Sequence, residues 1–290
     1  MGYITKSLIK RWLSLDRPAD AHKGDFGRLL VVGGSSKYTG APALVGLAAL
    51  RTGVDLVTIC APRESAMVIS TFSPDLITVK LPCTNLEPEV LELVLEEAEN
   101  ADAVVIGPGL GRSEKTYSAV PQLLQNLNPR QIPVLLDADG LKAAATQKSL
   151  LKSPKLVLTP HAGEFEVLTG KPLPKNLEER VKTVSSASRE LGCTILLKSH
   201  VDIIADGNQV FLNRTGNPGM TVGGTGDVLA GIVGALLAQG VEPVKAAACG
   251  AYINGLAGDL CLKEKGYWFT ATDIVGKIPE VLISIWRGSR

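Results

Sequence analysis

Short apolar runs alternate with longer amphipathic stretches along most of the chain. This alternation predicts an α/β protein, because strands that are separated by helices pair in a mainly parallel central sheet. The connecting helices cover both faces of such a sheet. The runs that we interpret as strands of this sheet lie at 28–33, 55–60, 76–80, 103–106, 133–137, 156–158 and 194–198.

Two further runs, 202–205 and 210–212, flank the turn-forming residues Asp206, Gly207 and Asn208. This pattern predicts a β-hairpin at one edge of the sheet. Apolar residues that recur on one face at helical spacing predict helices, and they make the last third of the chain mostly helical. The helices predicted in this way lie at 89–98, 179–191, 227–238, 243–262 and 272–286.

Size and composition predict one large domain. The chain has 290 residues, of which 45% are hydrophobic, and this is enough apolar material for a large core. No internal repeat and no long linker divides the sequence. We therefore expect a single domain at residues 23–290, preceded by an N-terminal helical extension at residues 1–22.

Charge and composition exclude several classes of partner. Thirty basic residues nearly balance 29 acidic ones, and aromatic residues make up only 4% of the chain, so we expect no nucleic-acid partner. No apolar run approaches the length of a membrane span, so we expect no membrane partner. The five cysteines form no CxxC pair, and basic residues interrupt any signal-peptide core near the start. We therefore predict a cytoplasmic protein with neither disulfides nor zinc.

Polar, glycine-rich segments follow five of the predicted strands. In an open parallel sheet, ligands bind beyond the carboxyl ends of the strands, where loops and helix N-termini converge. Five such segments at one edge of a sheet are hard to explain as scaffold alone. They lie at 33–42, 107–111, 137–140, 159–164 and 198–200.

The segment 217–227, which opens a long apolar helix, carries the strongest signal for chemistry. Its glycines leave backbone N–H groups free to point at an anion, and the helix dipole adds partial positive charge there. A helix capped by Thr225, with a favourable acid in its first turn, would account for Thr225 and Asp227 but not for the glycines. We therefore predict an anion hole formed by Gly223, Gly224, Thr225 and Gly226.

Other motifs for phosphate binding or nucleophilic catalysis are missing. The sequence contains no GxxxxGK[ST] loop, no GxGxxG fingerprint and no GxSxG elbow. His161 lies at the mouth of a predicted strand, between Pro160 and Gly163. Two interpretations stay open for it, an ordinary loop histidine and a ligand contact.

Taken as an ordered set, the motifs of the chain are specific, although each alone is weak. They are Lys23-Gly24-Asp25-x-Gly27, Val31-Val32-Gly33-Gly34, Tyr38-Thr39-Gly40-Ala41-Pro42, Gly107-Pro108-Gly109-Leu110-Gly111, Asp137-Ala138-Asp139-Gly140, Thr159-Pro160-His161-x-Gly163-Glu164, Asn217-x-Gly219-Met220 and Gly223-Gly224-Thr225-Gly226-Asp227. With this set the chain resembles the ADP/ATP-dependent NAD(P)H-hydrate dehydratases, a branch of the ribokinase-like superfamily. The resemblance covers nearly the whole chain, from Lys23 onward.

The resemblance implies a ribokinase-like fold and a hydro-lyase that repairs nicotinamide cofactors. Such enzymes dehydrate the (S)-hydrate of NADH or NADPH back to the working cofactor. The co-substrate implied is ADP, which is converted into AMP and phosphate, or ATP in eukaryotic members. Hydroxide is a poor leaving group, so the hydrate hydroxyl is first phosphorylated and phosphate is then eliminated.

The resemblance also implies roles for single residues. Asp227 takes the catalytic role of the base, although a helix N-terminus stabilises its carboxylate and should lower its basicity. Glu164 helps to hold Mg²⁺ through water. The residues implied to contact the hydrate are Ala41, Gly109, Gly111, His161 and Asp227. Those implied to contact the nucleotide are Lys198, Ser199, His200, Val201, Asp202 and Gly226.

The chain departs from the family pattern after Lys198. The family commonly has Gly there and Thr further on, whereas this chain has Ser199-His200-Val201-Asp202. The preference for ADP or ATP, and for NADH or NADPH hydrate, therefore stays open. The resemblance further implies a homotetramer. Many members carry a fused epimerase domain for which this chain is too short, so we expect the epimerase to be a separate protein.

Two other functions share these residues. A ribokinase-like kinase would use the same anion hole and Asp227 to phosphorylate a small hydroxylated vitamin precursor, and would release a stable phosphorylated product. Such kinases usually have Thr-Pro-Asn-x-x-Glu where this chain has His161 after Thr159-Pro160. A non-catalytic nucleotide-binding regulator is the second alternative, but a pure binder has no need for the base.

Overall fold

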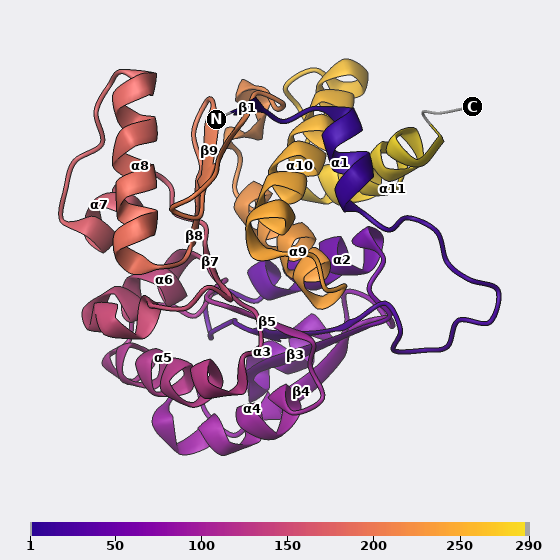
Figure 1. The fold of residues 1–290 in the computed structure, drawn as a ribbon. Helices are drawn as coiled ribbons and strands as arrows, with labels where there is room; N and C mark the ends of the chain where they lie inside the picture. Colours follow the sequence, from indigo (N-terminus) through magenta and orange to yellow (C-terminus); the bar gives the residue numbers. More distant parts are fainter. Residues whose placement is uncertain (1, 288–290) are drawn as a thin grey trace.

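One ten-stranded sheet organises the molecule in the computed structural model, which describes residues 2–287 (Figure 1). The strands are β1 (Gly2–Tyr3), β2 (Arg28–Val32), β3 (Leu56–Pro62), β4 (Ile77–Leu81), β5 (Ala103–Ile106), β6 (Val134–Leu136), β7 (Leu156–Leu158), β8 (Thr194–Leu197), β9 (Asp202–Ala205) and β10 (Val210–Asn213). Their order across the sheet is β1-β10-β9-β8-β7-β6-β5-β2-β3-β4. All neighbouring strands from β8 to β4 are parallel, whereas β9 runs antiparallel to both of its neighbours.

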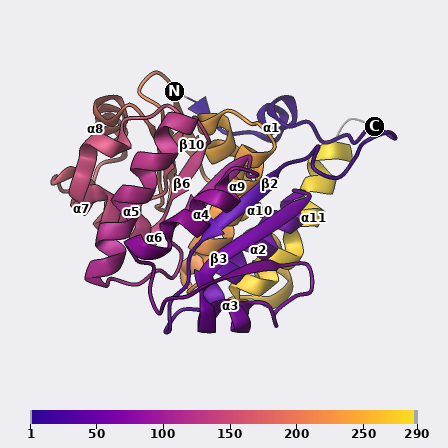
Figure 2. The ribbon, with the colours of Figure 1, turned by 90° about the horizontal axis from the view of Figure 1, so that it is seen from below.

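Helices cover both faces of this sheet (Figures 1 and 2). One face carries α1 (Lys6–Trp12), α2 (Gly40–Thr52), α3 (Arg63–Ile69), α9 (Thr225–Ala238), α10 (Pro243–Lys265) and α11 (Ala271–Arg287). The other face carries α4 (Leu91–Ala98), α5 (Glu114–Leu127), α6 (Ala138–Ala144), α7 (Ala162–Thr169) and α8 (Leu177–Leu191).

Each strand supplies side chains to two separate cores. In β2, Leu29 and Val31 join the core under α2 and α9, whereas Leu30 and Val32 join the core under α4 and α5. Successive side chains of a strand point to opposite faces, so a strand that is buried on both faces must be apolar throughout. This explains why β2, β5 and β8 appear in the sequence as continuous apolar runs.

The predicted strands and the mainly parallel sheet are confirmed. The predicted hairpin is also confirmed, because β9 and β10 pair antiparallel and the Asp206 carboxylate accepts hydrogen bonds from the backbone of Asn208 and Gln209 in the turn. Strand β1 was not predicted, and it pairs parallel to β10 on the outer side of the hairpin. The segment 1–22 thus contributes a two-residue strand as well as the short helix α1.

Helices end close to where their periodicity predicts. The helix predicted at 89–98 starts with a 3-10 turn, Pro88–Val90, before α4 begins. The long C-terminal helices extend a few residues beyond the predicted bounds. Within the described residues, no helix has the length and apolarity that a membrane crossing would require.

Helix α9 packs closely against α2 and α10 because glycines leave room at both contacts. A Cβ atom at Gly231 of α9 would lie 2.3 Å from the carbonyl oxygen of Val45 in α2. A Cβ atom at Gly250 of α10 would lie 2.3 Å from a methyl carbon of Val233 in α9. Because real Cβ atoms do not approach other atoms so closely, these glycines set the position of α9 between its neighbours.

We predict that Gly231→Ala lowers the free energy of unfolding by about 1–3 kcal/mol, since the added methyl group meets backbone that cannot give way. Gly276→Ala is the matched control, because Gly276 is also helical and a Cβ there has no neighbour within 4 Å. That change should stabilise α11 by up to about 1 kcal/mol through helix propensity alone. Urea unfolding of both variants tests this, and equal midpoints would contradict the packing described above.

Candidate active site

The N-terminus of α9 is open toward the carboxyl edge of the sheet. Gly224 is its N-cap residue, and no side chain caps this helix end. Thr225 is the first helical residue, and its hydroxyl donates to the carbonyl oxygen of Met220, 2.9 Å away. Its hydroxyl therefore holds the preceding loop together instead of capping the helix. The first backbone N–H groups of α9 stay available for an anion.

The glycines of this loop differ in their structural roles. Gly224 has φ +95°, and a Cβ there would lie 2.7 Å from Leu44 of α2 and 2.8 Å from Ala271 of α11. Only glycine fits this position without strain. Gly226 faces Lys198, whose Nζ would lie 3.6 Å from an added Cβ, so the missing side chain keeps space open beside the ammonium group. Gly223 meets neither constraint, since a Cβ there would have open space around it.

Lys198 follows β8 directly and brings a positive charge to this edge. Its backbone N–H donates to the carbonyl oxygen of Pro160, which joins the ends of β7 and β8. Its Nζ donates to Asp137 Oδ1 over 2.8 Å and lies 3.9 Å from Glu164 Oε2. Burial by itself would lower the pKa of Lys198, but the carboxylates of Asp137 and Glu164 outweigh it, so the pKa is raised. Lys198 therefore stays charged next to Gly226.

Asp227 is partly buried in the first turn of α9. The helix N-terminus predicts a lowered pKa for this carboxyl group, and that expectation is wrong in sign. Burial raises the pKa of Asp227 to about 7, and the nearby Asp137 carboxylate adds to the rise while the Lys198 ammonium opposes it. Desolvation is the largest cause of this rise in pKa, because burial penalises the charged form of the carboxyl group. A carboxylate with a pKa near neutrality suits general-base catalysis.

Asp137 is the main site residue to which sequence analysis assigned no role. It follows β6 directly, is 2% exposed, and its Oδ1 accepts hydrogen bonds from Lys198 and from the Thr159 hydroxyl. The next residue, Ala138, has φ +50°, a conformation that costs free energy in any residue except glycine. Its place in a strand-end motif was visible in the sequence, but its contact with Lys198 depends on how β6 and β8 lie in the sheet.

Glu164 and His161 form a capping box at the start of α7. Glu164 Oε2 accepts from the backbone N–H of His161 over 3.0 Å, and His161 Nδ1 accepts from the backbone N–H of Glu164 over 3.3 Å. The His161 ring is 57% exposed, so it can also contact a ligand. The capping box gives His161 a structural role, and its exposed ring is compatible with a ligand contact, which stays a prediction.

Glu164 does not present a free set of oxygens to a metal ion. It is 3% exposed, and Lys142 and Lys198 lie 3.3 Å and 3.9 Å from its oxygens. Among residues 2–287, no three His, Cys, Asp or Glu side chains are grouped as a metal site. Direct coordination by Glu164 therefore does not fit this arrangement, whereas a contact through water leaves its partners in place.

A further cluster of charged side chains lies at a cavity of about 500 Å³ beside His161, which Arg112 and Lys142 help to line. The carboxylate of Asp139 pairs with both Arg112 and Lys142, each at 3.2 Å. Lys142 also contacts Glu164, and through Glu164 it links Asp139 and Arg112 to Lys198. Asp139 and Lys142 lie one turn apart on α6, whereas Arg112 precedes α5 and Glu164 lies on α7, so the sequence alone does not show that these side chains meet.

The remaining residues that were predicted to contact the hydrate lie near the ends of β2 and β5. The Ser35 hydroxyl donates to the carbonyl oxygen of Gly109 over 2.8 Å. Gly109 has φ +72°, and a Cβ there would lie 3.3 Å from Ala41 of α2. Gly111 lies next to Ser35 in the same arrangement, so Ala41, Gly109 and Gly111 share one surface. Gly224 connects this surface to α9 through its contact with α2.

The strip after Lys198 is a turn held by its own polar groups. Asp202 Oδ1 accepts from the backbone N–H of Ser199, and Asp202 Oδ2 accepts from Asn213. Burial raises the pKa of Asp202 to about 6. Ser199 and Asp202 thus shape the turn, while His200 is exposed and Val201 is only partly buried. Among residues 2–287, none of these four side chains forms a hydrogen bond or an ion pair with Asp227.

Known proteins resemble this chain over nearly its whole length. The sequence profile of the family described as NAD(P)H-hydrate dehydratase matches residues 29–280. An ADP-dependent (S)-NAD(P)H-hydrate dehydratase from Nitrosopumilus maritimus is 38% identical over 280 residues, which cover 96% of each chain. The crystal structure of the ADP/ATP-dependent NAD(P)H-hydrate dehydratase from Bacillus subtilis, co-crystallised with ATP and Mg²⁺, superimposes with a TM-score of 0.80 at 26% identity, covering 99% of this chain and 98% of that one.

Other relatives are longer proteins. The Bifunctional NAD(P)H-hydrate repair enzyme Nnr from Pyrobaculum aerophilum is 45% identical over 271 residues, which cover 93% of this chain and 53% of the relative. The chain thus spans about half the length of these bifunctional relatives. The matched profile covers most of the chain, and the identity to relatives is well above 30%. The chain therefore belongs to the NAD(P)H-hydrate dehydratase family.

Proposed function

We propose that the chain is a hydro-lyase that dehydrates the (S)-hydrate of NADH or NADPH and converts ADP into AMP and phosphate. The observation that carries this proposal is that Asp227, with a pKa of about 7, and the Lys198 ammonium, which acts on it electrostatically, lie together at an uncapped helix N-terminus. A base next to an anion hole suits phosphoryl transfer to a hydroxyl group. The names of the family relatives support the same substrate and nucleotide.

The reaction proceeds in two steps. The hydrate oxygen attacks the terminal phosphoryl group of ADP, the bond from that phosphorus to the bridging oxygen breaks, and AMP leaves. The ring nitrogen lone pair then expels phosphate together with the former hydroxyl oxygen, and loss of a proton from the neighbouring carbon restores the dihydronicotinamide. The first step is needed because phosphate is a far better leaving group than hydroxide.

Asp227 accepts the proton of the hydrate hydroxyl in the first step. Its pKa of about 7 keeps a useful fraction ionised at neutral pH while retaining more basicity than an ordinary carboxylate has. The surface of Ala41, Gly109 and Gly111, together with the exposed His161 ring, holds the hydrate in place. The positions of the reacting groups contribute strongly to the rate of this step, since phosphoryl transfer passes through a loose transition state.

The charge on the transferred phosphoryl group is met by the backbone N–H groups of Gly224, Thr225 and Gly226 and by Lys198. Such donors are fixed before the reaction, so they need no reorganisation when charge develops. Gly226 provides the space in which the Lys198 ammonium and a phosphate oxygen can meet. We assign the strip from Ser199 to Asp202 to the nucleotide side of this site.

Mg²⁺ accompanies the nucleotide in this proposal, as the structure of the Bacillus subtilis relative with ATP and Mg²⁺ suggests. It would neutralise phosphate charge, and Glu164 would hold it through water, because lysines already occupy the carboxylate directly. On the basis of the family resemblance we further propose a cytoplasmic homotetramer that works together with an epimerase.

We predict that NADH hydrate regains the absorbance of reduced nicotinamide when the protein, Mg²⁺ and ADP are all present, with ATP tested in parallel. Asp227→Asn should slow this recovery by about 10²–10⁴-fold, which is the usual contribution of a positioned base. Lys80→Gln, a change on the distant edge strand β4, serves as the control. A stable phosphorylated product without recovery would indicate the small-molecule kinase instead, and undiminished activity of Asp227→Asn would remove Asp227 from its role.

We predict that kcat/KM rises as the pH increases through about 7, because Asp227 acts in its ionised form. The Lys198 ammonium lowers the pKa of Asp227, so Lys198→Gln should move the rising limb to higher pH as well as reduce the rate. Rate profiles between about pH 5 and about pH 9 measure both effects. A rising limb near the ordinary Asp value, or one that stays in place in Lys198→Gln, would contradict this arrangement.

A further inference from the structure

The cavity of about 500 Å³ beside His161 is only partly used by the function proposed above. His161 and Glu164, which line it, belong to the candidate active site. Arg112 and Tyr117, which also line it, come from the segment around the start of α5. The volume lies within the range found for small-molecule sites. The roles assigned so far leave Arg112 and Tyr117 without a function.

The nitrogen-bearing side chains at this cavity are held close together by shared carboxylate oxygens. Arg112 Nε and Lys142 Nζ each lie 3.2 Å from Asp139 Oδ1, so these two nitrogens are separated by at most twice that distance. Lys142 Nζ and His161 Nε2 lie 3.3 Å and 3.4 Å from Glu164 Oε1, which limits their separation in the same way. Arg112, Lys142 and His161 therefore form one connected group of donors along the cavity.

Arg112 keeps most of its donors free for a ligand. Its Nε donates to Asp139 Oδ1, whereas its two terminal nitrogens form no hydrogen bond or ion pair within residues 2–287. Those terminal N–H groups form a planar fork that matches two oxygens of a phosphate group. The bond to Asp139 thus orients the guanidinium group without occupying the fork.

Arg112 also adjoins the surface that is proposed to hold the hydrate. It directly follows Gly111, which belongs to that surface. Tyr38 lies close enough to Arg112 to act electrostatically on its guanidinium group. The Cβ atom of Tyr38 would in turn lie 3.0 Å from a Cβ atom at Gly109. Arg112 therefore lies at the boundary between the hydrate surface and the cavity.

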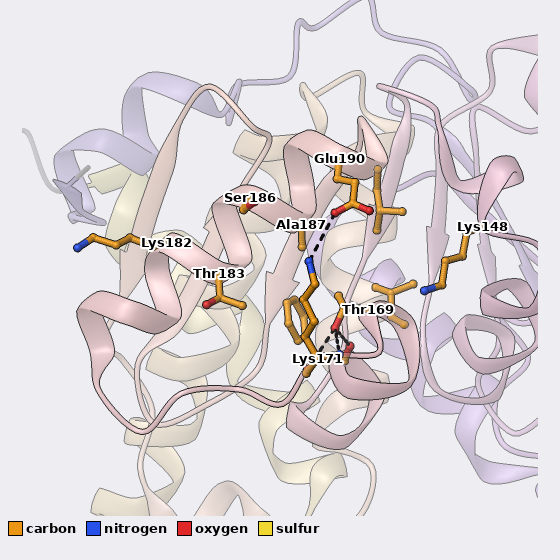
Figure 3. A pocket seen from close by; sticks show the side chains of 11 residues that line it. Lys148, Thr169, Lys171, Lys182, Thr183, Ser186, Ala187 and Glu190 are labelled. Carbon is orange, nitrogen blue, oxygen red and sulfur yellow. Dashed lines mark hydrogen bonds and ion pairs between the residues drawn. The ribbon is translucent and has the colours of Figure 1, made fainter.

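The pocket between α7 and α8 offers no such group of donors among the described residues (Figure 3). Lys171 is 69% exposed there and reaches Glu190 only at 4.0 Å, as the dashed line in Figure 3 marks. An exposed pair of this kind contributes little and fixes neither side chain. Phe165 and Leu168 at this pocket are fully buried, so a ligand cannot pack on them. The cavity beside His161 is therefore the better site for an anion.

The chemistry of the proposed substrate indicates which anionic group reaches this cavity. In a hydrated nicotinamide dinucleotide, the pyrophosphate is one ribose away from the nicotinamide ring. The 2′-phosphate of NADPH lies on the far ribose, which carries the adenine. When the hydrated ring is at Asp227, a cavity that begins at Glu164 and His161 is next to the pyrophosphate.

We propose that Arg112 determines specificity for a dinucleotide by binding the pyrophosphate of the hydrate, with Lys142 and His161 as neighbouring donors. This inference rests on the proposed function, because it takes the hydrated dinucleotide as the ligand. His161 Nδ1 accepts from the backbone N–H of Glu164, so the proton of the neutral ring is on Nε2, where it can be donated to a phosphate oxygen. Asp139 acts as a positioning residue through Nε of Arg112.

Binding of NADH and NADPH to the full chain tests this role without turnover, with the fluorescence of the reduced nicotinamide as the signal. Arg112→Gln should weaken the binding of both dinucleotides by about tenfold or more, as the loss of charge-assisted hydrogen bonds does. Arg112→Lys should restore only part of the affinity, because an ammonium group lacks the planar fork. Arg130→Gln is the matched control, since Arg130 lies beyond the other end of α5, in the 3-10 turn Asn128–Arg130.

Kinetics separate a pyrophosphate contact from a merely structural role. Arg112→Gln should raise KM for NADH hydrate and NADPH hydrate by a similar factor and leave kcat and the KM for ADP nearly unchanged, because the contact is the same in the ground state and the transition state. A structural role would lower kcat or weaken the use of ADP as well, and that result would overturn the proposal.

Three binding results would also overturn the proposal. They are unchanged affinity of Arg112→Gln for both dinucleotides, a loss of affinity for NADPH alone, and an equal loss in Arg130→Gln. The first result, with normal binding by the unchanged chain, overturns only the role of Arg112. If the unchanged chain binds neither NADH nor NADPH, the proposed function fails together with this inference.

Discussion

The ammonium group of Lys198, held between the carboxylates of Asp137 and Glu164, is the interaction on which the candidate site depends. The ammonium group binds Asp137 after β6, the backbone N–H of Lys198 binds Pro160 after β7, and Gly226 in the first turn of α9 leaves room for the side chain. Removing one member of such a buried pair leaves an uncompensated charge, at a cost of about 3–5 kcal/mol. The same group sets the electrostatics of the site, because it opposes the rise in the pKa of Asp227.

The rest of the fold keeps α9 in the position that this interaction requires. Gly231 and Gly250 let α9 pack closely against α2 and α10, and Gly224 fits between α2 and α11 at the open end of the helix. A shift of α9 by the width of a methyl group would move its first N–H groups and Asp227 together. The close packing on one face of the sheet therefore determines the geometry at its carboxyl edge.

Sequence patterns predicted the architecture well, because strands buried on both faces are continuous apolar runs and helices follow a separate periodicity. They also placed Lys198, His161 and Glu164 just after strands, and Asp227 in the first turn of a long helix, where the structure has them. Two kinds of property were out of reach. The strand Gly2–Tyr3 is too short to form a pattern, and its pairing with β10 is set by tertiary contacts.

Electrostatics was the other property that the sequence did not reveal. The sign of the pKa shift of Asp227 depends on how deeply the carboxyl group is buried and on its distance from Asp137, and neither can be read from spacing along the chain. The contacts of Asp137 with Lys198, of Asp139 with Arg112 and of Lys142 with Glu164 have the same origin, since side chains from separate elements meet only in the folded protein. Motifs thus located the candidate site, and packing decided its charge.

The central claim is that the hydrate oxygen is phosphorylated before it leaves. NADH hydrate labelled with ¹⁸O in its hydroxyl group tests this directly, when it is converted with ADP and Mg²⁺ and the products are analysed by mass spectrometry. If the hydroxyl oxygen attacks phosphorus, the label appears in the inorganic phosphate that is released. Label found in water, with unlabelled phosphate, would mean that hydroxide leaves without phosphorylation and would contradict the account.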